Sequence, residues 1–350
     1  MSVRLLVLSD THLGFDLPMR PRVARPRRGE DFFAAFESAL APASRGEVDA
    51  VVHLGDLFFR SRISAALATR VFTRLAELAD SGADVFWVPG NHERSGVPRG
   101  LLLDHPRIHV FDRPRTVVLR RHGLALALAG FPFTPSARAD FRALLAATRH
   151  DELEADARLL CLHQAVEGAR VGAQEFTFRD GAEVVRGADL ADDAAGFLAV
   201  LCGHVHRAQV VERDLAGRPL PVPVIYPGST ERTSSAERDE VNGFLTLAVE
   251  RRDSVGPAGL RWDFHPLASR PMIVLDVDPR RGGHALAVHL RSALAALAPR
   301  SIVRLRLAAP PSGEAIEVLR AASLRALAPA GMEVSVGWGR WSDNRTADPR

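Results

Sequence analysis

Side chains of the kinds that bind divalent metal ions are concentrated in five short segments of this sequence. The segments are, in chain order, DTHLG at 10–14, GDLFF at 55–59, GNHE at 90–93, LHQ at 162–164 and GHVH at 203–206. Their candidate metal ligands are Asp10, His12, Asp56, Asn91, His163, His204 and His206. A mixed shell of imidazole and oxygen ligands suits manganese, iron or zinc better than an all-oxygen magnesium or calcium site. Two such ions held about 4 Å apart can clamp a phosphoryl group and lower the pKa of bound water, so the segments indicate hydrolysis of phosphate esters.

These segments follow short apolar runs that are typical of buried strands. The expected strands cover 4–10, 49–56, 84–92, 157–164 and 196–206. Amphipathic helices are expected at 30–40 and 64–80, between the first three strands. This alternation predicts an α/β fold with a mostly parallel, helix-covered sheet. Open α/β sheets place their sites at the C-terminal ends of the strands, where these candidate ligands stand. His53 lies inside a strand and is expected to support the site rather than to bind metal.

The five segments, in this order and at strand ends, resemble the calcineurin-like metallophosphoesterase superfamily. The resemblance implies a catalytic core of helix-flanked β-sheets. It assigns the first ion to Asp10, His12 and His206, and the second ion to Asn91, His163 and His204. By the same resemblance Asp56 would bridge the two ions. His92 would approach the phosphate as a general acid that protonates the leaving oxygen.

A second resemblance, to the SbcD-type DNA repair nucleases, narrows the superfamily. It depends on SDTHLG with GDLF, on RRGEDFFAAF, and above all on YPGSTERTSSAERDEVNGF at 226–244. In that family this last region links the catalytic domain to a smaller capping domain. Residues 272–338 read as strand, helix, strand, helix and strand, with helices at 284–297 and 313–327, which predicts a small two-layer α/β unit. We therefore expect a metallophosphoesterase domain over 1–268, a capping domain over 269–340 and a tail over 341–350.

One position departs from the pattern of these families. The third residue after the bridging aspartate is commonly a histidine or aspartate that orients the catalytic histidine, whereas here it is Phe59. His92 is therefore expected to lack a polar partner. Because a well-oriented general acid contributes roughly 10²–10⁴-fold to the rate, this predicts reduced activity or a different leaving group.

The net charge of the chain says little about its partners, so local clusters of charged residues are the better indicator. The 350 residues contain 45 Lys+Arg and 42 Asp+Glu, a formal net charge of +3, and every basic residue is an arginine. The densest basic cluster is MRPRVARPRR, with Arg20, Arg22, Arg25, Arg27 and Arg28. Its prolines prevent a continuous helix, so the segment reads as a basic loop suited to lie along a phosphate backbone. A solvated loop in an arginine-rich protein is the alternative interpretation.

The leading functional prediction is a metal-dependent DNA exo- or endonuclease of the SbcD type. Its expected cofactors are two divalent ions, with manganese preferred and iron or zinc as alternatives. The alternative functions are a stand-alone phosphodiesterase or phosphatase acting on small molecules or proteins, and a weakly catalytic metal-binding scaffold. The discriminating feature is the region around Ser229 with the capping unit, which favours the nuclease.

The candidate partners are DNA, an SbcC-type coiled-coil ATPase and a second copy of the chain. Residues 341–350 leave little room for the helical segment by which such nucleases dock on that ATPase, which argues against this partner. No membrane partner is expected, because the sequence has no apolar run of about 20 residues. The early Ser9 and Asp10 also make the N-terminus unlike a secretion signal, so a cytoplasmic location is expected.

Overall fold

The computed structural model describes residues 1–18, 27–93, 105–172, 176–251 and 256–337. The chain divides into two compact units. The first contains Met1–Thr233 and Asp239–Ser269, and the second contains Ser234–Arg238 and the chain from Arg270 onward. In the part of the chain that the structure describes, no helix has the length and apolar character that crossing a bilayer requires.

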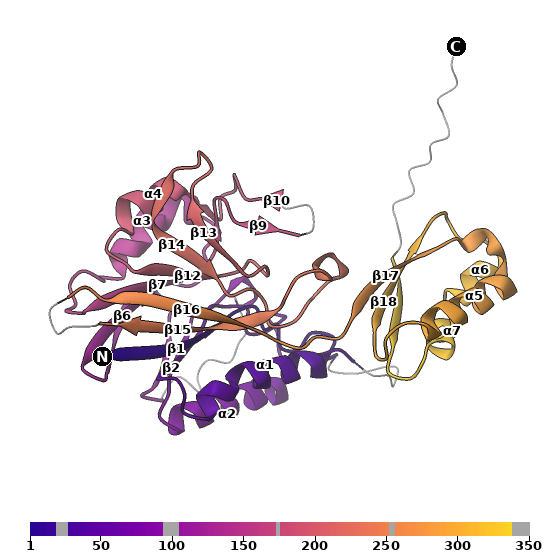
Figure 1. Ribbon diagram of the computed structural model, residues 1–350, viewed down its shortest axis with the longest axis horizontal. Helices are drawn as coiled ribbons and strands as arrows, with labels where there is room; N and C mark the ends of the chain where they lie inside the picture. Colours follow the sequence, from indigo (N-terminus) through magenta and orange to yellow (C-terminus); the bar gives the residue numbers. More distant parts are fainter. Residues whose placement is uncertain (19–26, 94–104, 173–175, 252–255, 338–350) are drawn as a thin grey trace, which may run out of the picture. The chain divides into compact units, whose positions relative to one another are not determined.

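The first unit contains two six-stranded mixed sheets (Figure 1). One has the strand order β16-β15-β1-β2-β3-β4. Its strands are β1 (Ser2–Leu8), β2 (Ala50–His53), β3 (Asp84–Trp87), β4 (Ile108–Val110), β15 (Gly243–Glu250) and β16 (Gly259–Pro266). Strands β1 to β4 are parallel, and β15 and β16 extend the sheet in antiparallel fashion.

The second sheet has the strand order β13-β14-β12-β7-β6-β5. Its strands are β5 (Arg115–Arg121), β6 (Leu124–Gly130), β7 (Ala157–His163), β12 (Ala199–Gly203), β13 (Gln209–Arg213) and β14 (Pro219–Tyr226). Its four inner strands are parallel, and the outer strands β5 and β13 are antiparallel to their neighbours. Two small two-stranded sheets join β8 (Ala165–Val166) with β11 (Val184–Val185), and β9 (Arg170–Val171) with β10 (Phe176–Thr177).

The two large sheets pack face to face and carry helices on their outer faces. One apolar core joins side chains such as Leu5 and Val52 of the first sheet to Leu159 and Leu201 of the second. The covering helices are α1 (Gly29–Ser44), α2 (Ala65–Asp80), α3 (Ala137–Ala147) and α4 (Gly187–Asp193). Helices α1 and α2 cover the first sheet, while α3 and α4 cover the second. The helix-flanked sheets that the resemblance implies are confirmed as a pair, and the second sheet buries one face against the first sheet and the other against α3 and α4.

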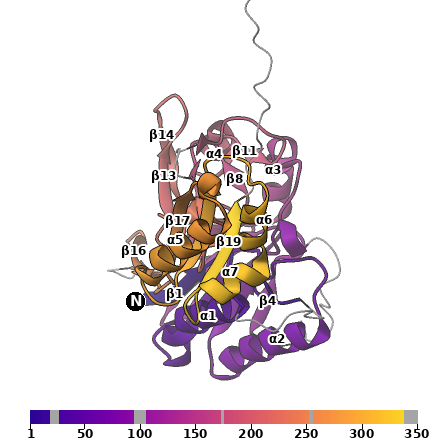
Figure 2. The same cartoon turned by 90° about the vertical axis from the view of Figure 1, so that its right-hand side faces the viewer.

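The second unit is a three-stranded parallel sheet with helices on one side (Figures 1 and 2). Its elements are β17 (Met272–Val277), α5 (Gly283–Ala295), β18 (Ile302–Leu307), α6 (Glu314–Val318), α7 (Ala321–Leu327) and β19 (Glu333–Gly337). The single helix expected over 313–327 is wrong, because Arg320 has extended backbone angles and separates α6 from α7. A continuous helix would turn Leu319 and Leu324 about 140° apart, and the break lets both side chains enter one core.

Candidate metal centre

The seven predicted ligands come together at the C-terminal edges of the two large sheets. Asp10 and His12 follow β1, Asp56 follows β2, and Asn91 begins the 3₁₀ turn Asn91–Glu93 after β3. His163 is the last residue of β7, and both His204 and His206 follow β12. Most of the ligands therefore lie just beyond their strands.

The backbone at several of these positions is in the left-handed region. Its φ angle is 51° at Asp10, 45° at His12, 51° at Asp56 and 85° at His204. Residues other than glycine adopt such angles at a cost of order 1–3 kcal/mol each, and these residues cluster at functional sites. The local turns therefore aim these side chains inward at the expense of intrinsic backbone preference.

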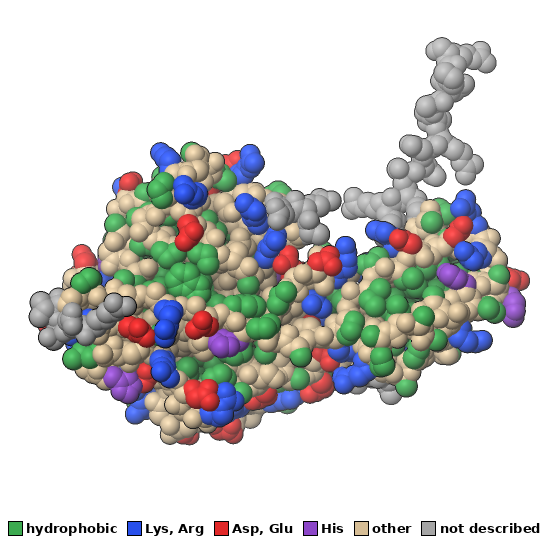
Figure 3. Space-filling model, in the orientation of Figure 1, with side chains coloured by type: hydrophobic (Ala, Val, Ile, Leu, Met, Phe, Trp, Pro, Cys, Tyr) green, Lys and Arg blue, Asp and Glu red, His purple; other side chains and the backbone are tan. Residues whose placement is uncertain are grey.

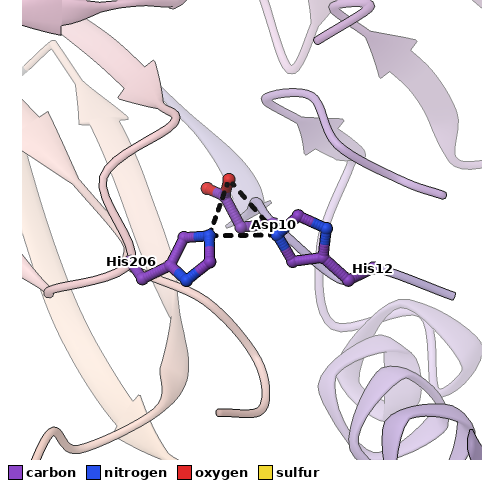
Figure 4. Close-up of side chains that lie close together, drawn as sticks. All are labelled: Asp10, His12 and His206. Atoms are coloured by element: carbon purple, nitrogen blue, oxygen red, sulfur yellow. Dashed lines mark hydrogen bonds and ion pairs between the residues drawn. The ribbon is translucent and has the colours of Figure 1, made fainter. Parts of the chain in front are cut away.

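One ligand group consists of Asp10, His12 and His206 (Figure 4). The Nε2 atoms of His12 and His206 are 3.0 Å apart, and Asp10 Oδ1 lies 3.7 Å from His206 Nε2 and 4.0 Å from His12 Nε2. Asp10 Oδ1 and His12 Nδ1 are buried without a hydrogen-bond partner among the described residues. Burial raises the pKa of Asp10 and lowers the pKa of His12. A cation between the three ligand atoms would compensate the buried carboxylate, so this group fits a divalent ion.

A second group is centred on the side-chain oxygen of Asn91. Asn91 Oδ1 lies 3.1 Å from His163 Nε2 and 3.0 Å from His204 Nδ1. His163 Nδ1 lies 2.6 Å from the carbonyl oxygen of Leu54, and a hydrogen bond donated there directs Nε2 toward the site. Burial lowers the pKa of His204 to about 3, which favours the neutral imidazole that a metal requires.

Asp56 lies between the two groups. Its Oδ1 is 3.5 Å from His163 Nε2, and ligand atoms of Asp10, Asp56 and His163 all lie within 4.8 Å of one another. Burial opposes ionisation of Asp56, but His163 outweighs it and holds the pKa of this carboxyl below its usual range. Although burial acts against it, Asp56 raises the pKa of His163 to about 9 in return, so an ion bound by His163 would displace the proton from its Nε2. An ionised carboxylate is thus placed within reach of both ligand groups.

His92 stands beside Asp56 and has a polar partner. Its Nδ1 lies 2.6 Å from the backbone carbonyl oxygen of Phe59, and its backbone N–H donates to Asp56 Oδ1 at 3.0 Å. The expectation that Phe59 deprives His92 of a partner is therefore wrong, because a main-chain carbonyl at that position accepts the hydrogen bond that a side chain would accept. His92 Nε2 lies 3.7 Å from Asp56 Oδ2, and the side chain is 31% exposed.

Two further polar side chains support the ligand loops. Glu93 is fully buried and accepts hydrogen bonds from the backbone amides of Asp56, Phe58 and Gly90. Burial, and then the nearby Asp56, raise the pKa of Glu93 to about 8. His53 is buried and contacts Thr11 Oγ1 at 3.0 Å, as expected for a supporting histidine. The sequence placed Glu93 beside a ligand, but only the fold shows that its carboxyl group ties two ligand loops together.

The predicted basic loop has a mixed outcome. Arg20, Arg22 and Arg25 lie outside the described residues. Arg27 makes an ion pair with Asp16 at 3.2 Å, and its side chain is 18% exposed. Arg28 is 6% exposed, and its guanidinium bonds to Glu231 and to the carbonyl of Arg232. The expectation of a DNA contact at Arg28 is therefore wrong, because its guanidinium is enclosed by the protein and cannot reach a phosphate.

Two arginines that sequence reasoning missed lie beside the metal centre. Arg60 and Arg62 are exposed and line a cavity of about 710 Å³ together with Arg27, Asp16 and Leu67 of α2. The cavity also contains Leu13 and Gly14, which directly follow His12. On the face shown in Figure 3, arginine and acidic side chains are interspersed. The signal that could have identified Arg60 and Arg62 from the sequence is their position just after GDLFF.

Comparison with known proteins decides the family. Residues 3–208 match the family model described as calcineurin-like phosphoesterase. The chain belongs to this family. The calcineurin-like phosphoesterase fold described above carries the metal-binding candidates at its strand ends, and the family match includes all seven of them.

The chain is also similar to archaeal proteins named DNA double-strand break repair protein Mre11. The one from Haloferax volcanii is 33% identical over 239 residues, which cover 67% of this chain and 47% of the relative. The one from Halobacterium salinarum is 30% identical over 239 residues, which cover 67% of this chain and 54% of the relative. The chain thus spans about half the length of these curated relatives. A solved dimetal phosphatase from Danio rerio is a weaker likeness, at 13% identity and a TM-score of 0.44 over 71% of this chain and 94% of that chain.

Proposed function

We propose that this phosphoesterase hydrolyses DNA phosphodiesters with two divalent ions, as a nuclease of DNA repair. The observation that carries the proposal is the place of Asp56, whose carboxylate lies within reach of two ligand groups. One ion would be held by Asp10, His12 and His206, and the other by Asn91, His163 and His204. Manganese is the proposed native metal, because the ligands mix imidazole with carboxylate and amide oxygens.

The side chains around the ligands suit phosphodiester hydrolysis. When bound, the two ions would polarise the phosphate and lower the pKa of an attacking water. Asp56 would fix the spacing of the two ligand groups. His92 Nε2 faces Asp56 while Nδ1 is engaged by the Phe59 carbonyl, so Nε2 is the nitrogen placed to deliver a proton to the leaving oxygen.

DNA is the proposed substrate for two reasons. The relatives in the comparison are named as proteins of DNA double-strand break repair. The cavity beside His12 is lined by the exposed Arg60 and Arg62, which can neutralise the phosphates that flank a scissile bond. Binding should therefore depend on salt and hardly on sequence.

The proposed function also gives a role to each of the two units and implies a protein partner and a location. The two compact units would be the catalytic domain and the capping domain. A second copy of the chain is the proposed protein partner, and the cytoplasm is the proposed location.

The experiment that tests this function is cleavage of end-labelled duplex DNA by purified, manganese-loaded protein. We expect manganese-dependent cleavage, and DNA binding that weakens with salt by about 0.9 log units per log unit of salt for each neutralised phosphate. A small-molecule phosphodiesterase would hydrolyse bis(p-nitrophenyl) phosphate without binding DNA. A scaffold would bind DNA and leave it uncut. Either outcome, in protein that contains both ions, would reject the nuclease.

A further inference from the structure

Arg28 is a buried cation that two aromatic rings, those of Phe15 and Phe59, connect to the proposed catalytic histidine. It is the residue before α1, and its side chain is 6% exposed. Its guanidinium carbon lies 5.1 Å from the ring centre of Phe15 and 5.3 Å from that of Phe32. Nη2 bonds to Glu231, itself 2% exposed, and to the carbonyl of Arg232. Burying a charge is costly unless it is paired, so this arrangement fixes Arg28 in one place.

Ring contacts lead from Arg28 to the metal centre. Phe15 packs edge-on against Phe59 with ring centres 4.8 Å apart. The ring of Phe59 lies 5.9 Å from that of His92 and 6.0 Å from that of His12. The backbone carbonyl of the same Phe59 is the partner of His92 Nδ1. A shift of Phe15 would therefore move the residue that orients His92.

A second route leads from Arg28 through the loop that it holds. This loop contains Glu231 and Arg232, and Ser229 three residues before Arg232 donates its N–H to the carbonyl of His206 at 3.0 Å. Ser229 also pairs with Ser9, the residue before Asp10. The guanidinium of Arg28 thus joins the ring contacts at His92 to the loop that supports His206.

We propose that Arg28 is a positioning residue for the metal centre, which holds Phe59, and through it His92, in the orientation that proton delivery needs. The inference builds on the proposed nuclease function. This role of Arg28 differs from contact with DNA, because its guanidinium contacts two aromatic rings, a carboxylate and a carbonyl oxygen inside the protein. The planar guanidinium can stack on the rings and donate hydrogen bonds to both oxygens at once, whereas a lysine ammonium would make fewer of these contacts.

The test compares Arg28→Met and Arg28→Lys with the wild type, with Arg45→Met as the control. Arg45 is a 57% exposed arginine that follows the same helix α1, and it pairs with Glu47. For Arg28→Met we expect kcat on DNA to fall 10–100-fold, with KM changed less than threefold, because a misplaced general acid weakens the chemical step. The loss should be much smaller on bis(p-nitrophenyl) phosphate, whose leaving group needs little protonation. Arg28→Lys should recover part of the rate, and Arg45→Met should match the wild type.

A readout on metal-free protein separates this inference from the nuclease proposal. Long-range ¹H–¹⁵N spectra of the histidine rings should show a proton on His92 Nδ1 in the wild type and in Arg45→Met. In Arg28→Met that tautomer should lose its preference. If Arg28→Met does not fold, Glu231→Gln is the second variant. It should lower kcat on DNA and weaken the tautomer preference of His92 as Arg28→Met does, but by less.

Three results would overturn the inference. The first is an unchanged His92 spectrum in a folded Arg28→Met protein. The second is an equal loss of rate on DNA and on the chromogenic diester. The third is a salt slope of DNA binding that falls by about one unit with kcat intact, which would make Arg28 a phosphate contact. A wild type that cuts no DNA would reject the nuclease, while the spectra would still decide the role of Arg28.

Discussion

Replacing Gly203 with alanine would push a methyl group into the ligand set. Gly203 ends β12 directly beside His163, its partner in the parallel pairing with β7. An added Cβ would lie 2.0 Å from the carbonyl oxygen of Leu54 and 2.8 Å from His163 Nδ1. These two atoms form the hydrogen bond that directs His163 toward the second ion. Gly203→Ala therefore disturbs the hydrogen bond that orients His163 but leaves every metal ligand in the sequence.

The size of the effect follows from this geometry. Real Cβ contacts essentially never fall under 3.0 Å, so the Leu54 carbonyl or His163 must move. Overpacking of this kind costs about 1–3 kcal/mol of stability. Loss of the hydrogen bond that orients a metal-binding histidine typically weakens metal affinity about 10–100-fold. We expect the second manganese ion to bind that much more weakly, and the first ion to keep its affinity within a few-fold.

The assay is titration of metal-free protein with manganese by calorimetry, together with thermal unfolding of the metal-free protein. Gly196→Ala is the matched control, because a Cβ there would meet nothing within 4 Å and the residue lies shortly before the same strand. It should behave as wild type in both measurements. Wild-type affinity for both ions in a folded Gly203→Ala protein would refute the assignment of His163 as a ligand held by Leu54.

The other predictions concern the bridging ligand, the general acid and the arginines. Asp56→Asn should lose affinity for both ions and all turnover, and wild-type metal content measured by plasma mass spectrometry would contradict the bridge. His92→Ala should keep both ions but lose more rate on DNA than on bis(p-nitrophenyl) phosphate, and equal losses would argue against a general acid. Phe59→His should change the DNA rate by less than about twofold, because the main-chain carbonyl already engages His92; a tenfold gain would show that this bond is insufficient. Changing both Arg60 and Arg62 to Ser should lower the salt slope of DNA binding by about two units and spare the chromogenic diester, and an unchanged slope would exclude both as phosphate contacts.

Much of the fold could be predicted from apolar runs that end in polar signatures. The expected strand over 157–164 corresponds to β7 (Ala157–His163), and the expected helix over 64–80 to α2 (Ala65–Asp80). The expected strands near Asp10 and Asp56 extended too far, because left-handed backbone angles end the strands earlier, and periodicity does not reveal such angles. Which strands belong to each of the two sheets was not predicted, since apolar runs do not tell which strands pair.

The site was predictable where side-chain type alone carries the chemistry. Asp10, Asn91 and the histidines were candidates because few residue types bind metals, and the structure brings these candidates together. The partner of His92 was missed because it is a main-chain carbonyl, which every residue possesses and no sequence pattern marks. Arg28 was misjudged because its neighbours in the chain are basic, whereas its contacts Glu231 and Arg232 lie about 200 residues further along.

Electron paramagnetic resonance of the protein during titration with manganese tests the central claim, a pair of ions bridged by Asp56, most directly. The first equivalent should give the spectrum of an isolated ion. The second equivalent should replace it with the spectrum of an exchange-coupled pair, because one carboxylate would join ions about 4 Å apart. A single binding site, or two ions whose spectra stay uncoupled at full occupancy, would contradict the two-ion centre and the mechanism that depends on it.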